Sequence, residues 1–402
     1  MQDPQQTEAF IVELGRALHR YGASTARIEA AMTQLAVRLG IDAQFFVQPT
    51  ALFASFGRGG AETYLLRLEP PITDLTRLAR LDALLMALLR RELTAPQGPA
   101  VLAEILRERR GRRWTPVLFG GHTLAAAAAA RFVGGGWREI AVAGAIGLVV
   151  GFLARLADKR PGFTRIQLPV SAICASFLAV AAAVAFGPLN PQVAMLAGLV
   201  VLLPGLALTV ALSELATHHL ASGTARAAGA LVVFVAMAFG VALGARLAAL
   251  VFGAAPIADP IAAPGWTLAL AVVLAPIAMA ALFRVPRSEI PFVVAGCAMA
   301  FAGGLGGARV LGPELGVFVG GFLAGAAANG YARLRNRPSA IVYLPALLML
   351  VPGSIGFRSV TALLADHVTS GIEAAFTTLL MAVALGTGML VAGVFVPPRR
   401  VL

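Results

Sequence analysis

Charge is the scarcest property of this sequence. Asp, Glu, Lys and Arg make up only 13% of the 402 residues, whereas 58% are hydrophobic and the mean hydropathy is +0.82. Soluble globular proteins carry roughly 25% charged residues. A deficit of this size excludes a soluble protein for most of the chain and indicates a surface that faces lipid.

Cysteine and histidine are also rare. The two cysteines, Cys174 and Cys297, lie in apolar runs without a histidine or cysteine at metal-ligand spacing. We expect them to be small core residues, so the sequence implies no disulfide, no metal site and no cofactor. His19 is the only histidine before residue 114, and no serine or cysteine is placed near it for nucleophilic catalysis. We therefore expect a solvated histidine on a helix face and no enzymatic activity.

Positive charge is concentrated in short clusters. The formal net charge of +12 would suit a nucleic-acid partner, but much of the excess arginine lies beside apolar runs, as at 109–113 and 333–337. Membrane proteins mark their cytoplasmic loops in this way, whereas segments 187–190 and 253–265 contain no basic residue. We expect no nucleic-acid partner, both termini in the cytoplasm and these two segments outside.

Residues 1–113 have the composition of a soluble domain. Apolar residues recur at helical spacing over 7–21 and 24–39, and three strand-type segments follow at 42–47, 51–56 and 62–68. Two more helices are expected at 74–93 and 99–110. The pattern predicts a small cytoplasmic α+β domain, for which we expect a regulatory or assembly role.

The rest of the chain alternates long apolar runs with short polar connectors. A helix needs roughly 20 residues to span the hydrocarbon core of a bilayer. Ten segments meet this criterion: 115–132, 140–156, 166–186, 191–211, 225–251, 266–283, 290–310, 314–331, 341–360 and 374–396. The fold class predicted is a polytopic α-helical membrane protein. Pro204-Gly205 and Pro352-Gly353 fall inside the fourth and ninth segments, so these two are full or broken helices.

The membrane region contains an internal repeat. Leu203-Pro204-Gly205 aligns with Val351-Pro352-Gly353, and about forty following residues stay in register, including His219 with His367 and Gly240 with Gly388. The two halves, 114–253 and 264–398, then hold about five spans each. Because five is an odd number, the second half enters the membrane inverted. Inverted repeats with helices broken near mid-membrane characterise secondary transporters.

The two breaks supply the first candidate site. Backbone groups freed by a break need a substrate or a water-filled cavity, because lipid cannot satisfy them. A helix that restarts there aims its positive N-terminal end at a carboxylate. Candidate residues are Pro204, Gly205, Pro352, Gly353 and Ser354. Each Pro-Gly pair could instead simply kink a packed helix.

Ionisable and amide side chains within spans supply the second set, because such groups are costly in lipid. They are Glu214, His219, His122, Arg358, Asp366, His367 and Asn329. Glu214 either relays protons with its neighbouring histidines or lies at the cytoplasmic interface. His122 is expected to be a buried titrating group, and Asn329 either caps backbone or touches substrate. Glu214 aligns with Ala362, so one site is expected to handle a cation or proton and the other a carboxylate.

Several segments together resemble a known family. They are Leu14-Gly15-Arg16-Ala17-Leu18-His19-Arg20-Tyr21-Gly22-Ala23-Ser24, Pro49-Thr50-Ala51-Leu52-Phe53-Ala54-Ser55-Phe56-Gly57, Gly135-Gly136-Trp137, and Leu203-Pro204-Gly205 with Ser213-Glu214, His219, Gly223 and Arg226. Over nearly its whole length the chain resembles the bacterial threonine/serine exporters. The resemblance implies a cytoplasmic domain before two five-helix halves in the inner membrane. It also implies antiport driven by the proton gradient, with threonine, serine or, in split relatives, succinate as substrate.

Four functions remain open at this stage. The preferred hypothesis is a proton-coupled exporter of threonine and serine; a dicarboxylate exporter is the alternative, and Arg358 would suit either anion. The third is a membrane-bound hydrolase, but the N-terminal region lacks the nucleophile–base motif that hydrolysis needs. The fourth is a membrane scaffold, which would leave the broken helices unexplained. The expected partners are the small substrate, protons and lipid, with homo-oligomerisation undecided.

Overall fold

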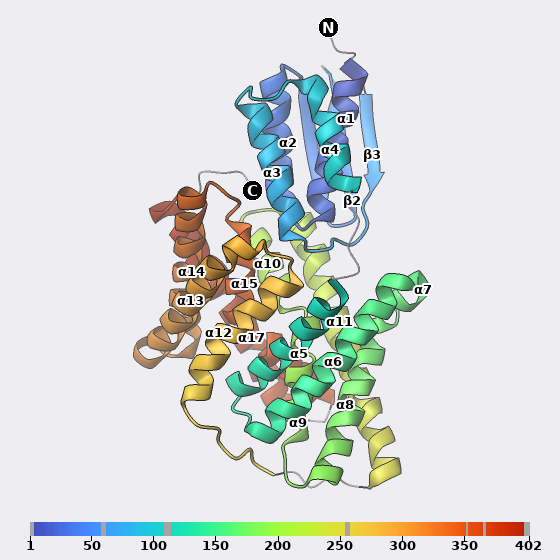
Figure 1. Cartoon of the computed structure of the whole chain (residues 1–402), viewed down its shortest axis with the longest axis vertical. Coiled ribbons are helices and arrows are strands. Elements are labelled where there is room, and N and C mark those ends of the chain that lie inside the picture. The colour runs from blue at the N-terminus through green and yellow to red at the C-terminus, as the bar shows by residue number, and fades with distance from the viewer. Residues whose placement is uncertain are drawn as a thin grey trace.

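The chain folds into two regions stacked along its longest axis (Figure 1). A computed structural model describes residues 4–57, 62–107, 114–253, 258–350, 353–364 and 367–397. The N-terminal α+β region occupies one end, and the helical membrane region occupies the rest of the length. Two of the candidate site residues, Pro352 and Asp366, lie outside the described residues.

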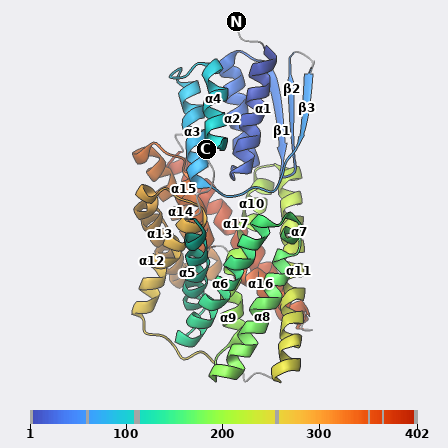
Figure 2. The ribbon, with the colours of Figure 1, turned by 45° about the vertical axis from the view of Figure 1, so that its right-hand side comes forward.

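The N-terminal region is a three-stranded sheet with helices packed beside it (Figure 2). Its elements are α1 (Pro4–Arg20), α2 (Thr25–Leu39), β1 (Ala43–Gln48), β2 (Ala51–Phe56), β3 (Glu62–Arg67), α3 (Leu75–Leu89), the 3₁₀ turn η1 (Ala95–Gln97) and α4 (Gly98–Arg107). The strands form an antiparallel sheet in the order β1-β2-β3, with Phe56 of β2 paired to both Ala43 and Glu62. The expected small α+β region is confirmed.

Local sequence explains these elements. In β2 every second residue is buried, namely Leu52, Ala54 and Phe56, as expected for a strand with one face on a core. Helix α2 ends at Gly40, whose φ of 72° is the left-handed conformation that glycine adopts without steric cost. The Asp74 side chain accepts a hydrogen bond from the backbone N–H of Arg77 and so caps α3.

The membrane region contains the remaining helices. They are α5 (Trp114–Phe132), α6 (Trp137–Lys159), α7 (Pro161–Thr164), α8 (Gln167–Phe186), α9 (Pro191–Gly198), η2 (Val200–Leu202), α10 (Gly205–Ala216), α11 (Leu220–Phe252), α12 (Trp266–Leu282), η3 (Arg287–Glu289), α13 (Ile290–Leu311), α14 (Pro313–Arg335), α15 (Ala340–Leu350), α16 (Gly353–Leu364) and α17 (Val368–Phe395). The chain is thus a polytopic helical membrane protein.

Fewer than the expected ten spans meet the criteria of length and apolar composition. Within the described residues seven helices do so, counting α15 with α16 as one, or eight if α9 and α10 form one bent span. Helix α12 is strongly apolar but has only 17 residues. Helix α5 is weakly apolar because it combines two glycines and a histidine with a run of alanines. Sequence runs alone overstated the number of long apolar helices.

The fourth expected span is broken. Helix α9 begins after Asn190, whose side chain accepts hydrogen bonds from two backbone N–H groups, and ends after only eight residues. A 3₁₀ turn follows, Leu203 is extended, and α10 starts at Gly205 directly after Pro204. The two helical pieces bend by 48°. In the second half α15 and α16 occupy the corresponding places, with α16 starting at Gly353.

The sequence repeat is also a repeat of local structure. Helices α10 and α11 begin at 205 and 220, and α16 and α17 begin 148 residues later, at 353 and 368. An added Cβ on Gly223 would lie 2.7 Å from Leu215, and one on Gly371 would lie 2.6 Å from Leu363. The aligned glycines therefore admit the aligned leucines in the same way.

Glycine pairs allow the long helices to approach closely. A Cβ on Gly240 or Gly244 of α11 would meet backbone oxygens of α8 at 2.7 or 2.4 Å. Gly321 and Gly325 of α14 are in similar contact with α17. In lipid, where apolar burial gives little driving force between helices, such close packing is a main source of association.

The N-terminal region is docked on the membrane region. The backbone N–H of Leu75 donates to the carbonyl of Phe283 at 2.9 Å, and Asp74 forms an ion pair with Arg284 at 2.8 Å. One continuous apolar core includes Leu78 of α3 and Val285 and Ile341 of the membrane region. The two regions are thus joined by a packed and hydrogen-bonded interface.

Candidate functional site

A cavity of about 290 Å³ lies where the two regions meet. The N-terminal region contributes the turn between α1 and α2, with His19 and Arg27, and the segment after β3, with Pro71 and Thr73. The membrane region contributes α10, the first two turns of α15, and Gly386 and Met389 of α17. The cavity is therefore shared by segments that lie far apart in the sequence.

One face of α10 forms a wall of this cavity. The lining residues are Leu206, Ala207, Thr209, Val210, Ser213, Glu214 and Thr217. Spacings of three and four residues place them on one side of a helix. Hydroxyl groups recur on this face at Thr209, Ser213 and Thr217, which gives an otherwise apolar helix a polar stripe. The stripe runs from the break at its start to the N-terminal region at its end.

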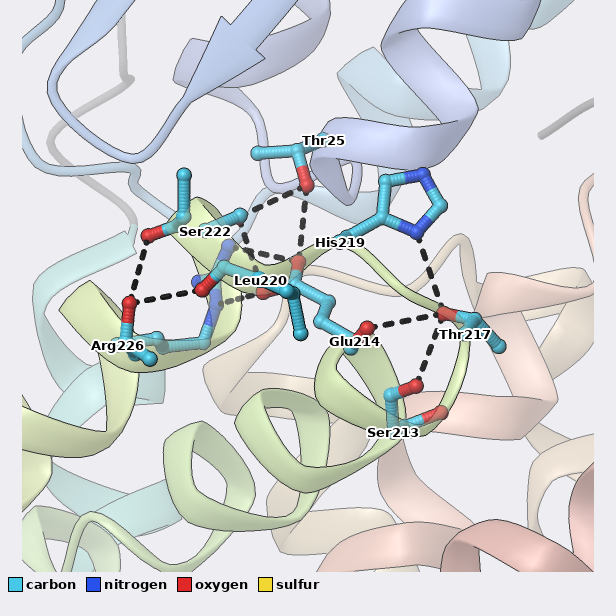
Figure 3. Close-up of polar contacts among 10 residues, drawn as sticks. Thr25, Ser213, Glu214, Thr217, His219, Leu220, Ser222 and Arg226 are labelled. Carbon is cyan, nitrogen blue, oxygen red and sulfur yellow. Dashed lines mark hydrogen bonds and ion pairs between the residues drawn. The ribbon is translucent and has the colours of Figure 1, made fainter.

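Glu214 is the charged centre of the site (Figure 3). Its carboxylate accepts hydrogen bonds from both the Nε and a terminal nitrogen of Arg226, each at 3.2 Å, and from the hydroxyl of Ser222 at 3.0 Å. Glu214 is 5% exposed, so the ion pair is largely removed from water. A bidentate arginine and an added hydroxyl supply charge-assisted hydrogen bonds, which are stronger than those between neutral groups.

Thr25 connects this centre to the N-terminal region. Its hydroxyl donates to Glu214 at 2.9 Å and lies 3.0 Å from the hydroxyl of Ser222. Thr25 is the first residue of α2 and is only 1% exposed. A charge-assisted hydrogen bond thus holds the start of α2 against the junction of α10 and α11.

Thr209 is unusual among the cavity residues. It is 2% exposed, and its hydroxyl has no hydrogen-bond partner within the described residues. Buried hydroxyls are normally hydrogen-bonded, and an unpaired one costs about 1–3 kcal/mol. Thr209 is therefore a cavity-lining residue whose buried hydroxyl has an unmet hydrogen-bonding capacity.

The starts of α10 and α16 meet at one point. A Cβ built on Gly353 would lie 3.2 Å from the Cα of Gly205 and 3.5 Å from the Cβ of Leu203. Helices α10 and α16 therefore start side by side. Leu206, the second residue of α10, lines the cavity, so the cavity reaches this meeting point.

The expectation that His19 is solvated was wrong, because His19 is 4% exposed. Its Nε2 lies 3.1 Å from the carbonyl oxygen of Glu69, and docking of the N-terminal region covers the ring. Burial lowers the pKa of His19, the hydrogen bond to Glu69 opposes this, and the nearby positive charge of Arg226 lowers the pKa further. The neutral imidazole is thus the favoured form.

The other candidates lie away from this cavity. His122 is buried, its Nδ1 is 2.9 Å from the carbonyl of Leu118, and its ring packs against Gly151 of α6. The amide of Asn329 donates to the carbonyl of Val396 near the end of α17. Arg358 is exposed on α16.

The histidines that precede α11 and α17 have similar backbone conformations. His219 precedes α11 with φ and ψ of −83° and 63°, and His367 precedes α17 with −88° and 65°. His219 Nδ1 lies 3.2 Å from the hydroxyl of Thr217, and neither histidine lines the cavity. Among the described candidates, Glu214 lines the cavity, Gly205 precedes the lining residue Leu206, and Gly353 lies against Gly205. The remaining described candidates, including Ser354, do not line the cavity.

Sequence reasoning missed the contribution of the N-terminal region. Thr25 and Arg27 directly follow a segment that suggested the family resemblance, but no local pattern links them to residue 214, because that contact depends on how the regions dock. Thr209 could have been found as a hydroxyl residue close after a helix break.

Comparisons with known proteins agree with the resemblance. Residues 9–248 match the family described as "Putative threonine/serine exporter", and residues 268–395 match the family described as "Threonine/Serine exporter, ThrE". The first match alone covers more than half of the chain. The chain belongs to the threonine/serine exporter family. Both parts of the family's membrane region are joined in this one chain, and membership implies a transporter rather than an enzyme.

Curated relatives of this exporter-family chain are fungal. It is similar to Pheromone-regulated membrane protein 10 of Candida albicans (strain WO-1), with 26% identity over 371 residues, which is 89% of this chain and 33% of the relative. The protein of that name in Saccharomyces cerevisiae (strain YJM789) is 27% identical over 391 residues, 93% of this chain and 49% of the relative. The chain thus spans a third to a half of the length of these relatives. No solved structure matches it.

Proposed function

We propose that this chain is a secondary-active exporter of threonine and serine, driven by the proton gradient across a bacterial cytoplasmic membrane. Both termini are then cytoplasmic, and the N-terminal region is a cytoplasmic domain of residues 1–113. The family descriptions supply the substrate class. The observation that carries the proposal is the meeting of two helix starts, at Gly205 and Gly353, beside the cavity.

The architecture we propose is a pair of inverted five-span repeats. Helices α5, α6, α8, α9 with α10, and α11 form the first, in residues 114–253. Helices α12, α13, α14, α15 with α16, and α17 form the second, in residues 264–398. Support comes from the 148-residue offset and from the matched glycine–leucine contacts of the two halves. In an inverted pair the broken spans face each other around a shared site.

The two helix starts bind the substrate in this proposal. Free N–H groups at the starts of α10 and α16 carry partial positive charge, which suits the carboxylate of an amino acid. Glycine at both starts leaves the backbone accessible. Pro204 lies directly before α10 and keeps the backbone N–H groups at its start out of a continuous helix.

Glu214 exchanges the driving proton in this proposal. It lines the cavity and is paired with Arg226, so protonation would remove the acceptor charge that holds both Arg226 and Thr25. Proton binding would thereby weaken the attachment of the N-terminal region. His122, the other predicted titrating group, is separated from the cavity by its packing between α5 and α6.

Export of a C4 dicarboxylate is the second candidate. The cavity walls carry two arginines, Arg27 and Arg226, against one carboxylate, Glu214. A net positive wall would suit an anion with two carboxylates as well as a zwitterion.

Counterflow in proteoliposomes tests the proposal. Purified full-length protein is reconstituted with unlabelled threonine inside, and uptake of labelled threonine, serine and succinate is followed with and without an imposed pH gradient. We expect threonine and serine to exchange, with net export responding to the gradient. Exchange of succinate alone would identify the dicarboxylate exporter, and exchange of none of the three would refute both candidates.

A further inference from the structure

Arg27 is positioned over the cavity by contacts with the membrane region. It lies in the first turn of α2, and a terminal guanidinium nitrogen donates to the hydroxyl of Ser339 at 3.3 Å. The guanidinium carbon is 5.7 Å from the centre of the Tyr343 ring, and Tyr343 itself lines the cavity on α15. A residue of the N-terminal region is thus oriented by two residues of the membrane region.

The charge of Arg27 is not neutralised within the described residues. Two other arginines near the interface have carboxylate partners: Arg226 pairs with Glu214, and Arg284 pairs with Asp74. Arg27 has only the hydroxyl of Ser339 and the face of Tyr343, although it is half-buried. A partly desolvated guanidinium without an anion is costly, and its planar array of donors matches a carboxylate.

Thr209 supplies an independent observation in the same cavity. Thr209 is 2% exposed, it lines the cavity on α10, and its hydroxyl has no hydrogen-bond partner in the described structure. One wall of the cavity therefore offers a cation without an anion, and another offers a hydroxyl without a hydrogen-bond partner. Both deficits would be met by one small molecule with a carboxylate and a second polar group.

We propose that Arg27 of the N-terminal region binds the carboxylate of the transported substrate, and that the hydroxyl of Thr209 hydrogen-bonds to another polar group of the same molecule. The inference rests on the proposed function in that it takes this cavity as the transport site. It makes the N-terminal region part of the substrate site, where sequence analysis expected a regulatory or assembly role. Before the substrate reaches the helix breaks, its carboxylate is held by Arg27.

The first test measures discrimination between threonine and threonine amide, which lacks the carboxylate charge. Both compounds compete for counterflow of labelled threonine by the full-length protein. We expect the wild type to prefer threonine. Arg27→Gln should lower the apparent affinity for threonine about 10- to 100-fold, because charged hydrogen bonds contribute roughly 1.5–3 kcal/mol. The apparent affinity for the amide should stay nearly unchanged. Arg27→Lys should recover part of the preference.

Two matched variants separate binding from docking. Ser339→Ala removes the contact that orients Arg27 but keeps its charge, and Arg38→Gln makes the same substitution on α2 at a residue that does not line the cavity. Arg38→Gln should keep the full preference for threonine over its amide, and Ser339→Ala should reduce this preference less than Arg27→Gln does. On α10, Thr209→Val should lower the apparent affinity for threonine by roughly 2- to 10-fold, as expected for the loss of one neutral hydrogen bond. Thr209→Ser keeps the hydroxyl and should not lower this affinity.

A binding measurement keeps this inference distinct from the proposed function. Thermal unfolding of the purified protein is followed with threonine, threonine amide and succinate. Stabilisation by a carboxylate that disappears in Arg27→Gln supports the inference even if threonine is not transported. An unchanged preference for threonine in Arg27→Gln, with normal counterflow, overturns the inference and leaves the exporter intact. Stabilisation of wild type by none of the carboxylates refutes it as well.

Discussion

The attachment of α2 to the membrane region should depend on the Thr25–Glu214 hydrogen bond. Thr25→Val keeps the shape of the side chain but removes the donor. The carboxylate then loses one of four hydrogen bonds, the others coming from Ser222 and from two nitrogens of Arg226. A hydrogen bond to a charged acceptor contributes roughly 1.5–3 kcal/mol. Glu214→Gln removes the negative charge of the ion pair. It should destabilise the attachment by about 3–5 kcal/mol, because it leaves Arg226 without its anion.

Hydrogen–deuterium exchange of the full-length protein measures this attachment. The amides of residues 22–28 and 214–222 should exchange at least tenfold faster in Thr25→Val, because 1.4 kcal/mol corresponds to a factor of ten. Thr224→Val is the matched control, since its hydroxyl bonds only to carbonyls of its own helix. Combining Thr25→Val with Glu214→Gln should destabilise the attachment by about 1–2 kcal/mol less than the sum of the two single substitutions. Additive costs, or exchange as slow as in wild type, would refute the coupling.

Three further predictions follow from the fold and the site. Gly205→Val and Gly353→Val should both insert in the membrane but lose most counterflow, because the two helix starts lie against each other and overpacking costs about 1–3 kcal/mol. A Cβ on Gly353 would already lie 3.2 Å from the Cα of Gly205. Normal counterflow by both variants would make these positions packing features. Thermal stability should be constant above about pH 6.5, the usual pKa of histidine, and should decrease as the pH falls below this value. Burial lowers the pKa of His19 in the folded protein, so the unfolded chain binds the proton at a higher pH than the folded protein does. An equally steep decrease in His19→Gln would contradict this. A cysteine at Ala258 should react with an impermeant thiol reagent on whole cells, and labelling only after lysis would reverse the proposed orientation.

Sequence periodicity was sufficient for the N-terminal region. Its strands and helices appeared near the expected boundaries because each is encoded locally, by alternation in β2 and by terminating residues such as Gly40. The membrane region was harder to delimit. Helix α5 forms although it is weakly apolar, and α12 forms although it is only 17 residues long, so criteria of hydropathy and length each miss a helix that the structure contains.

The candidate site was only partly accessible to sequence reasoning. The Pro-Gly pairs, the repeat and Glu214 all came from the sequence, and Gly205 and Gly353 do lie in contact. His122 seemed equally promising as a buried titrating group, yet its ring packs against α6 and does not line the cavity. A one-dimensional pattern gives depth in a span, but it does not say which side of a helix faces a cavity.

The sequence by itself determined the class of the protein, its N-terminal α+β region, its repeat and the helix break before Gly205. Apolar runs, Pro-Gly pairs and fixed offsets are all local or periodic properties. Only the tertiary structure decided that Thr25 reaches Glu214 across 189 residues of sequence and that Arg27 and Thr209 line one cavity. These contacts exist because an apolar interface around Leu78, Val285 and Ile341 docks the N-terminal region on the membrane helices. Such an interface is made by surfaces assembled from distant segments, and no single segment encodes it.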